Sequence, residues 1–355
     1  MTTADRPPAT GPGKPMPANT RRTTLAAVAR LAGVSVATVS KVVNGRSDVA
    51  PETRSRVQEL LHQHDYVAPV FRGPDPAARP TIEVQFGGDL NSYAAEALEG
   101  IVDAAAELEV SVVVSKPNHA ARWARDLVSA GRRALIAVTS VYTPAYLNAL
   151  TRAGLPLVVL DPLHLPHSDV NSVGSTNFAG GFAATQHLLS LGHRRIAYLG
   201  GPAIAACNQA RAHGYRAAME ARKMPVPRAY VRTGEFSYQT GLQGAAALLD
   251  LAEPPTAVFA GNDEIALGVI ETARTRGLRT PEDLSVVGFD DTLLAKMASP
   301  PLTTVSQPLR EMGGVALRTA LRLANGEKIE SHHIELATEL VVRASTAPHQ
   351  TQDKN

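Results

Sequence analysis

The chain has 355 residues, of which 44% are hydrophobic and 19% are charged, and its formal net charge is +2. That length and hydrophobic content suffice for several globular units with buried cores. The single cysteine, Cys207, excludes a disulfide framework and a cysteine-based zinc site. The sequence contains neither the apolar core of a signal peptide nor an apolar run of membrane-spanning length, so we expect a cytoplasmic protein.

Residues 1–20 are rich in Pro, Thr, Gly and Ala and lack apolar periodicity, which predicts a disordered tail. Residues 24–44 predict two short helices joined by a tight turn. Gly33 permits the backbone of a sharp turn, and Ser35 stands at the N-cap position of the second helix. The first helix has one apolar face at the i, i+3, i+4, i+7 spacing, formed by Leu25, Val28, Ala29 and Ala32.

The second helix has two different faces. Val39, Val42 and Val43 share the side that we expect to be buried. Residues 20–72 hold eight basic against four acidic side chains, an excess that is typical of phosphate contact. The alternative is a small helical bundle whose exposed helix binds nothing. The outward side carries small residues and one cation, which suits close approach to DNA base edges: Val36, Ala37, Ser40 and Lys41.

A third helix is predicted to begin at Pro51, a favourable first helical position, and to bury a stripe of Val57, Leu60 and Leu61. Residues 68–80 follow it and contain four prolines and one glycine. This composition opposes regular structure, so we interpret the segment as a linker.

From residue 81 the pattern changes to apolar strands that alternate with amphipathic helices, which predicts parallel sheets covered on both faces. The run is too long for one simple doubly wound sheet, so we expect two α/β lobes. Ligands in such folds bind beyond the carboxyl ends of the strands. The predicted strands are 82–86, 110–115, 134–139, 155–160, 196–199, 257–260 and 284–289, and the predicted helices include 94–109, 180–190, 209–221, 239–250 and 264–276.

Five ordered segments of the sequence resemble the LacI/GalR family of transcriptional regulators, and the similarity runs from about residue 23 to residue 346. A helix-turn-helix by itself is moderately specific. All five segments in the family's order and spacing are a much stronger indication. They are the helix pair through Asn44, Leu191–Ala197, Phe259–Asp263, Leu284–Asp291 and Pro301–Val305.

The resemblance implies an N-terminal all-α, lambda-repressor-like helix-turn-helix domain, followed by a two-lobed α/β effector domain of the periplasmic-binding-protein-like (type I) class. It also implies a homodimer on a near-palindromic operator, with a small effector between the lobes. The expected divisions are a tail (1–20), the DNA-binding domain (21–67), a hinge or linker (68–80), the effector-binding and dimerisation domain (81–347) and a tail (348–355). The N-lobe is expected to take about 81–174 and 307–338, and the C-lobe about 175–306 and 339–347.

The family's DNA-contacting positions also map onto this chain. Val36 and Ala37 have no hydrogen-bonding side chain, so they can read only DNA shape or a thymine methyl group. Lys41 is therefore the expected polar base contact, and a solvated lysine beside the DNA backbone is the alternative. The resemblance assigns base reading to Val36, Ala37 and Lys41, and mainly phosphate contact to Ser35, Thr38, Ser40 and Asn44.

The linker departs from the family pattern. Family members usually have a short hinge helix there, with an alanine–arginine pair and a leucine that enters the minor groove. Here Gly73 and Pro74 oppose a helix, and no leucine stands at the wedge position. Two readings stay open: a merely flexible linker, or a wedge supplied by Val70 or Phe71.

The expected effector cleft is formed by side chains at strand ends and helix starts. Carboxylates and amides exchange hydrogen bonds with sugar hydroxyls, an arginine offers a fork of donors, and an aromatic ring offers a flat face. The resemblance places six residues in this cleft: Asp161, Asn177, Arg211, Phe236, Asn262 and Asp290.

Some of these polar and aromatic residues have a structural alternative. Asp263 is expected to cap the helix that begins beside it rather than to bind a ligand. Phe236 is equally compatible with an ordinary core, and Asp161 with a turn before a proline. His164 and His167 fall in a proline-rich loop and are interpreted as loop residues, so no metal and no cofactor are expected.

Together these features predict a sequence-specific DNA-binding transcriptional regulator, most simply a repressor controlled by a small sugar. A purine or another metabolite is the alternative effector, because Phe236 can stack on a base. An α/β enzyme with an accessory DNA-binding domain is disfavoured, since no dinucleotide fingerprint, P-loop, H-E-x-x-H or nucleophile elbow occurs. The polar end 347–355 lacks apolar heptads, which favours a dimer. The expected place of action is the cytoplasm, at the nucleoid when the protein is bound to DNA.

Overall fold

The computed structural model describes residues 25–43, 49–64, 79–117, 122–140, 142–164 and 170–349. The chain divides into two compact units, Met1–Asp75 and Pro76–Asn355. Within the described residues no single helix is long and apolar enough to cross a membrane. Two consecutive helices, Leu25–Ala32 and Val36–Val43, are together long and apolar enough, but the chain bends by 107° between them. The tail 1–20 and the residues Asn44, Val70, Phe71 and His167 lie outside the described residues.

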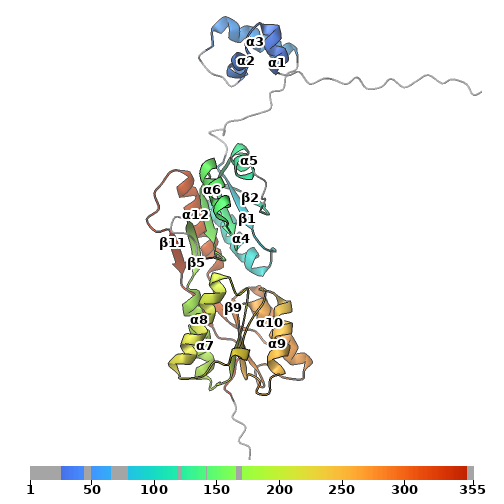
Figure 1. Ribbon diagram of the computed structural model, residues 1–355, viewed down its shortest axis with the longest axis vertical. Coiled ribbons are helices and arrows are strands. Elements are labelled where there is room, and N and C mark those ends of the chain that lie inside the picture. The colour runs from blue at the N-terminus through green and yellow to red at the C-terminus, as the bar shows by residue number, and fades with distance from the viewer. Residues whose placement is uncertain are drawn as a thin grey trace, which may run out of the picture. The chain divides into compact units, whose positions relative to one another are not determined.

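The described part of the first unit consists of α1 (Leu25–Ala32), α2 (Val36–Val43) and α3 (Pro51–Gln63), drawn in blue in Figure 1. The apolar faces expected from the sequence are buried. Val28 of α1 and Val39 of α2 pack in one small core with Val57 of α3, and all are fully buried. The helix-turn-helix therefore folds around its own core.

The first lobe of the second unit is built on a sheet of strand order β11-β5-β4-β3-β1-β2, in which every pair is parallel. Helices α4 and α12 pack together on one face, and α5 and α6 cover the other (Figure 1). Its elements are β1 (Thr81–Phe86), α4 (Ser92–Glu107), β2 (Ser111–Ser115), α5 (Trp123–Ser129), β3 (Arg132–Val138), α6 (Pro144–Ala153), β4 (Leu157–Leu160), β5 (Asn171–Ser175), α12 (Leu309–Ala324) and β11 (His333–Leu336).

The second lobe has a sheet of order β12-β10-β9-β8-β6-β7, parallel except for the pair β10 and β12. Helices α7 and α8 cover one face, and α9 and α10 cover the other. Its elements are α7 (Asn177–Ser190), β6 (Ile196–Gly200), α8 (Ala206–Ala221), the 3-10 turn Arg228–Tyr230, β7 (Val231–Thr233), α9 (Tyr238–Leu249), β8 (Ala257–Ala260), α10 (Asp263–Thr275), β9 (Ser285–Asp290), α11 (Leu293–Met297), β10 (Thr303–Ser306) and β12 (Glu339–Val341).

The chain passes between the lobes after β5, after β10 and again between β11 and β12. As a result, α12 and β11 from the C-terminal part of the chain complete the first lobe, where Figure 1 shows them in red beside green elements. The two lobes are thus tied together by crossing segments rather than by a single linker.

The predicted strands are all present within a few residues of their expected bounds, but the short strands β5, β7, β10, β11 and β12 were not predicted. Their sequences explain the omission. Strand β5 reads Asn-Ser-Val-Gly-Ser, and its polar side chains bond other segments of the chain; for example, Ser172 Oγ lies 3.0 Å from His333 Nδ1. Such strands carry no apolar run for a sequence pattern to detect.

Glycines decide how closely the paired helices approach. A Cβ on Gly100 of α4 would overlap the backbone of Arg310 in α12, and one on Gly214 of α8 would overlap the carbonyl of Phe178 in α7. Only glycine permits these backbone contacts, so both helix pairs depend on it.

Candidate functional site

The outward face of α2 is exposed, as the two-faced pattern of that helix predicts. Val36 leaves 48% of its surface exposed. Ser35, Ala37 and Lys41 are exposed beside it, and Thr38 and Ser40 are half-buried.

Ser35 caps α2. Its Oγ accepts the backbone N–H of Thr38 at 3.1 Å, which satisfies one of the free donors of the first turn. Gly33 has φ +67°, and the N–H of Val34 donates to the Ala29 carbonyl at 3.0 Å, so the chain turns sharply between the helices. The cap and the turn fix the direction of the exposed helix.

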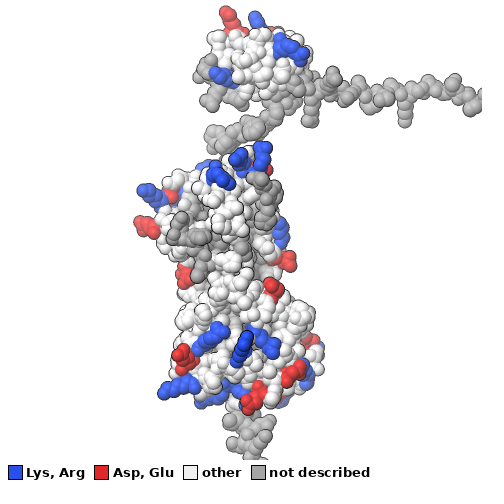
Figure 2. Space-filling model, in the orientation of Figure 1, with Lys and Arg blue, Asp and Glu red and all other residues white. Residues whose placement is uncertain are grey.

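The charge of this unit favours an anionic partner. Its described residues carry Arg30, Lys41, Arg54 and Arg56 against two acidic side chains, Glu52 and Glu59. Figure 2 shows the basic side chains spread over the unit in the view drawn. An exposed and capped helix on a basic unit is compatible with contact in the major groove of DNA.

The second candidate site is a cleft of about 530 Å³ that both lobes of the second unit line. Asp161 follows β4, Asn262 follows β8 and Asp290 ends β9, so three carboxyl ends of parallel strands meet here. The lining consists of Gly87, Gly88, Asp89, Asn91, Tyr93, Ala94, Thr139, Asp161, Leu163, Pro202, Cys207, Arg211, Glu235, Phe236, Ser237, Asn262, Glu264 and Asp290.

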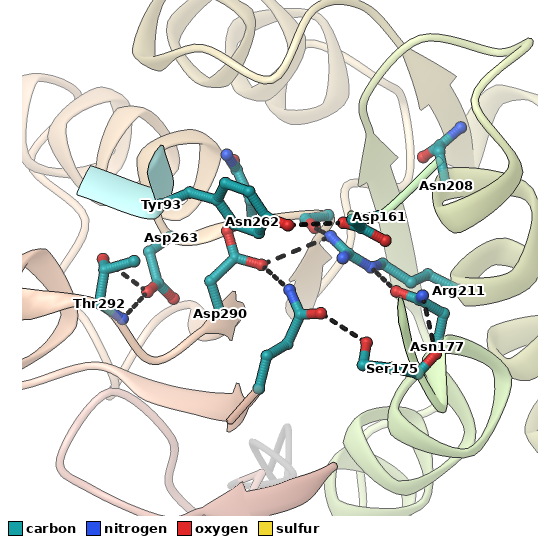
Figure 3. A network of polar contacts seen from close by, with 12 residues as sticks. Tyr93, Asp161, Ser175, Asn177, Asn208, Arg211, Asn262, Asp263, Asp290 and Thr292 are labelled. Atoms are coloured by element: carbon teal, nitrogen blue, oxygen red, sulfur yellow. Dashed lines mark hydrogen bonds and ion pairs between the residues drawn. The ribbon is translucent and has the colours of Figure 1, made fainter. Parts of the chain in front are cut away.

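Arg211 on α8 lines this cleft and contacts several of its polar groups, although only 2% of its surface is exposed (Figure 3). Its Nε donates to Asn177 Oδ1 at 2.7 Å, and its Nη1 donates to the Gly261 carbonyl at 2.6 Å. Nη1 also lies 3.7 Å from Asp290 Oδ1, and the guanidinium carbon lies 3.8 Å from the centre of the Phe289 ring. Among the described residues Nη2 makes no hydrogen bond, so it is available to a ligand.

Burial and the Arg211 charge act in opposite directions on the carboxyl groups of the cleft. Burial raises the pKa of Asp290 well above its usual range, and the nearby Arg211 guanidinium offsets part of that rise. Burial likewise raises the pKa of Asp161, while Arg211 and a hydrogen bond from the Tyr93 hydroxyl at 3.1 Å lower it. The charged form of both carboxyls is therefore stabilised by groups within the cleft, chiefly by the Arg211 guanidinium.

Asn177 is not among the lining residues of the cleft. It lies behind Arg211 and lines an adjoining cavity of about 700 Å³, which shares Asp161 and Cys207 with the cleft, and its Nδ2 donates to the Ser175 carbonyl at 3.0 Å. Ser175 Oγ in turn donates to Gln307 Oε1 at 2.5 Å, and Gln307 Nε2 donates to Asp290 Oδ1 at 2.6 Å. These contacts close a ring that joins the cleft to two of the segments that cross between the lobes (Figure 3).

The expectation that Asp263 caps α10 is wrong. Asn262 is the cap, since its Oδ1 accepts the backbone N–H of Ile265 at 2.9 Å. Asp263 is instead buried behind the cleft, where it accepts from Thr292 N at 2.8 Å and from Thr304 Oγ1 at 2.6 Å. Burial raises its pKa to about 7 despite these donors.

Phe236 lines the cleft and is half-buried, with its ring centre 5.7 Å from the guanidinium carbon of Arg211. It also packs on the core of the second lobe, as the structural alternative expected, and its contact with an effector stays a prediction. The remaining predicted residues, Asp161, Arg211, Asn262 and Asp290, all line the same cleft.

Apart from Asp161, the contribution of the first lobe was missed. Thr139 and Asp89 follow strands β3 and β1, so the rule that identified Asp161 would have found them too. Tyr93 and Asn91 stand at the start of α4, and their role depends on how that helix points, which no local pattern shows. In the described ranges no group of three or more His, Cys, Asp or Glu side chains is arranged to hold a metal ion.

Comparison with known proteins agrees with this architecture. Residues 24–68 match the family model "Bacterial regulatory proteins, lacI family", and residues 185–346 match "Periplasmic binding protein-like domain". The HTH-type transcriptional regulator DegA of Bacillus subtilis is 34% identical over 335 residues, which cover 92% of this chain and 99% of DegA. The chain belongs to the LacI family of bacterial regulatory proteins.

Two solved structures resemble this LacI family member over its length. A complex of the transcriptional regulator CelR with cellobiose has a TM-score of 0.70 and 33% identity, and the match covers 91% of this chain and 100% of CelR. The lac repressor dimer bound to operator and the anti-inducer ONPF has a TM-score of 0.69 and 28% identity, with 92% and 100% covered. The chain is thus a DNA-binding transcriptional regulator with a helix-turn-helix domain and a periplasmic-binding-protein-like domain.

Proposed function

We propose that this regulator is a repressor whose affinity for operator DNA is controlled by a small sugar bound in the cleft between the lobes. The observation that carries the proposal is the set of buried polar groups in that cleft. Arg211 Nη2 has no hydrogen-bond partner among the described residues, nor has Asn262 Nδ2, whose Oδ1 is used by the cap. Both side chains line the cleft, so these two donors can be offered to the hydroxyl groups of a ligand.

The similar structures support this choice of ligand. CelR was solved with cellobiose, and the lac repressor with operator and a small anti-inducer. In this chain Phe236 offers a flat face at the edge of the cleft and Asp161 and Asp290 offer acceptors, a combination that suits a sugar ring.

On the DNA side, we propose that α2 lies in the major groove. Val36 and Ala37 would contact base edges by shape and methyl groups, and Lys41 would supply a polar base contact. Ser35, Thr38, Ser40 and Asn44 would contact phosphates. A homodimer would place two such helices on a near-palindromic operator, in the cytoplasm at the nucleoid.

The ring of hydrogen bonds from Asp290 through Gln307 and Ser175 offers a route from ligand to DNA affinity. A ligand that contacts Asp290 or Arg211 alters a network anchored in two crossing segments of the lobes. The ligand changes operator affinity only if it binds two arrangements of the lobes, one that binds DNA and one that does not, with different affinities. The size of that difference sets the size of the change.

The test is operator binding at fixed salt, titrated with a panel of mono- and disaccharides. An active sugar should lower or raise operator affinity in the parent protein, and Asp290→Ala or Phe236→Ala should abolish that response. Operator affinity without sugar is measured for each variant as its own reference, because Asp290 also belongs to the network that joins the lobes. Glu282→Gln, an exposed residue outside the cleft, is the matched control. An unchanged dose response in both cleft variants would refute the assignment of the site.

A purine or nucleoside is the second candidate effector, because the half-buried ring of Phe236 faces the cleft and can stack on a base. The same titration with purines and nucleosides separates the two. A purine response that Phe236→Ala removes, without any sugar response, would favour this alternative.

A further inference from the structure

The charges around the cleft specify which sugars it accepts, if the proposed sugar site is correct. Asp89, Asp161, Glu235, Glu264 and Asp290 line the cleft, against one cation, Arg211. Even when Lys116 is counted, whose ammonium group donates to the Gly88 carbonyl, acidic side chains outnumber basic side chains five to two. We infer that the cleft selects uncharged polyhydroxylated ligands and rejects their phosphorylated or carboxylated counterparts.

The single cation inside the cleft is already compensated. The Arg211 guanidinium lies 3.7 Å from the carboxylate of Asp290 and against the face of Phe289. Its free Nη2 is therefore a directional donor for a hydroxyl group rather than an uncompensated charge for an anion.

Two of the helices that begin at the cleft, α4 and α10, have N-termini capped by a side chain, whereas α8 begins beside the cleft without such a cap. The N-terminus of a helix attracts anions through its free N–H groups and its dipole. At α4, Asn91 Oδ1 accepts the N–H of Ala94 at 3.0 Å, and at α10, Asn262 Oδ1 accepts that of Ile265 at 2.9 Å. The first turn of α10 adds two acidic residues, Asp263 and Glu264. Neither terminus is left as an anion site.

The acidic side chains come from both lobes, so an anion meets them on either side. Asp89 belongs to the first lobe and Glu235 to the second, and both are exposed. Glu264 of α10 is half-buried and lines the same cleft. Acidic side chains on both sides of the cleft would repel a phosphate or a carboxylate.

The proposal is tested by titrating the full-length protein with four matched pairs of probes at one ionic strength. The pairs are cellobiose and cellobionate, maltose and maltobionate, glucose and glucose 6-phosphate, and ribose and ribose 5-phosphate. Binding is measured by calorimetry and by thermal shift. At least one neutral probe should bind, and its anionic partner should bind at least tenfold more weakly.

Two variants separate the charge effect from the sugar site. In the double variant Asp89→Asn with Glu235→Gln, the ratio of the anionic to the neutral Kd should fall at least threefold, because two repulsive charges are removed. The control, Glu220→Gln with Glu282→Gln, removes the same charge from exposed positions outside the cleft and should leave the ratio unchanged.

The outcomes are distinct. An anionic probe that binds as tightly as its neutral partner, or a ratio unmoved by the Asp89 and Glu235 changes, overturns the charge selection and leaves the sugar site standing. Binding of neither form of any pair overturns the sugar site and the charge selection together.

Discussion

Replacing Arg211 by methionine tests the buried network of the cleft most directly. Methionine keeps much of the side-chain volume and its contact with the Phe289 ring, but it removes the charge and every donor. Asp290 then loses its cation, and Asn177 Oδ1 and the Gly261 carbonyl each lose a hydrogen bond. Breaking one side of a buried pair costs about 3–5 kcal/mol, and we expect a loss of that size in the free energy of unfolding at neutral pH.

The ion pair itself is isolated by a double-mutant cycle. Asp290→Asn alone leaves the Arg211 charge buried without its carboxylate, so it should also be destabilising. The double variant leaves no uncompensated charge, and its loss should be smaller than the sum of the two single losses by about 2–3 kcal/mol. Urea unfolding followed by circular dichroism gives each free energy, and equal m-values confirm that the denatured states are comparable.

The pH dependence supplies an independent readout. Without Arg211 the pKa of Asp290 in the folded protein rises further above its value of 3.8 in the unfolded chain, because burial is no longer offset. A folded carboxyl with a raised pKa binds a proton that the unfolded chain does not, so stability increases as the pH falls. The deficit of Arg211→Met should therefore be smaller at pH 5 than at pH 8. Additive losses within about 0.5 kcal/mol, together with a deficit that is independent of pH, would refute this account.

Three further predictions concern other parts of the chain. Ser35→Ala removes the cap of α2 and should cost the first unit about 1 kcal/mol and weaken operator binding, as measured by thermal unfolding and anisotropy; Ser35→Asp should restore the stability. Asp263→Asn removes a carboxyl whose pKa rises to about 7 when folded, so the stability of the parent relative to the variant should increase as the pH falls from 8 to 5, by at most about 1.4 kcal/mol per pH unit; a flat difference would contradict that pKa. Gly100→Ala forces the α4–α12 contact apart and should cost about 1–3 kcal/mol or more, whereas Gly174→Ala, which meets no atom within 4 Å, should cost much less; equal losses would show that the close approach is unimportant.

Much of the fold was predictable because its signals are local. Apolar runs such as Ala134–Val138 are buried on both faces, and a local sequence pattern is enough to identify them as strands. The short strands were not predictable from the sequence. Strand β5, for example, is stabilised by side-chain hydrogen bonds to residues more than 130 positions away in the chain, such as the bond from Ser175 to Gln307. Asp263 illustrates the same limit. An acidic residue at a helix start normally caps it, but here Asn262 has taken that role and Asp263 bonds Thr304 across the lobe.

The sequence by itself determined the helix-turn-helix, with its capped and exposed helix, the alternation of strands and helices, and four of the polar residues of the cleft, Asp161, Arg211, Asn262 and Asp290. These depend on periodicity, on caps and on the rule that strand ends meet at one edge of a parallel sheet. The tertiary structure decided which of those groups remain available. It placed Asn177 behind Arg211, added Asp89, Asn91, Tyr93 and Glu264 from elements far apart in the chain, and surrounded one compensated cation with carboxylates. Burial, pairing and charge balance arise only when distant segments pack together, so no local pattern could have shown them.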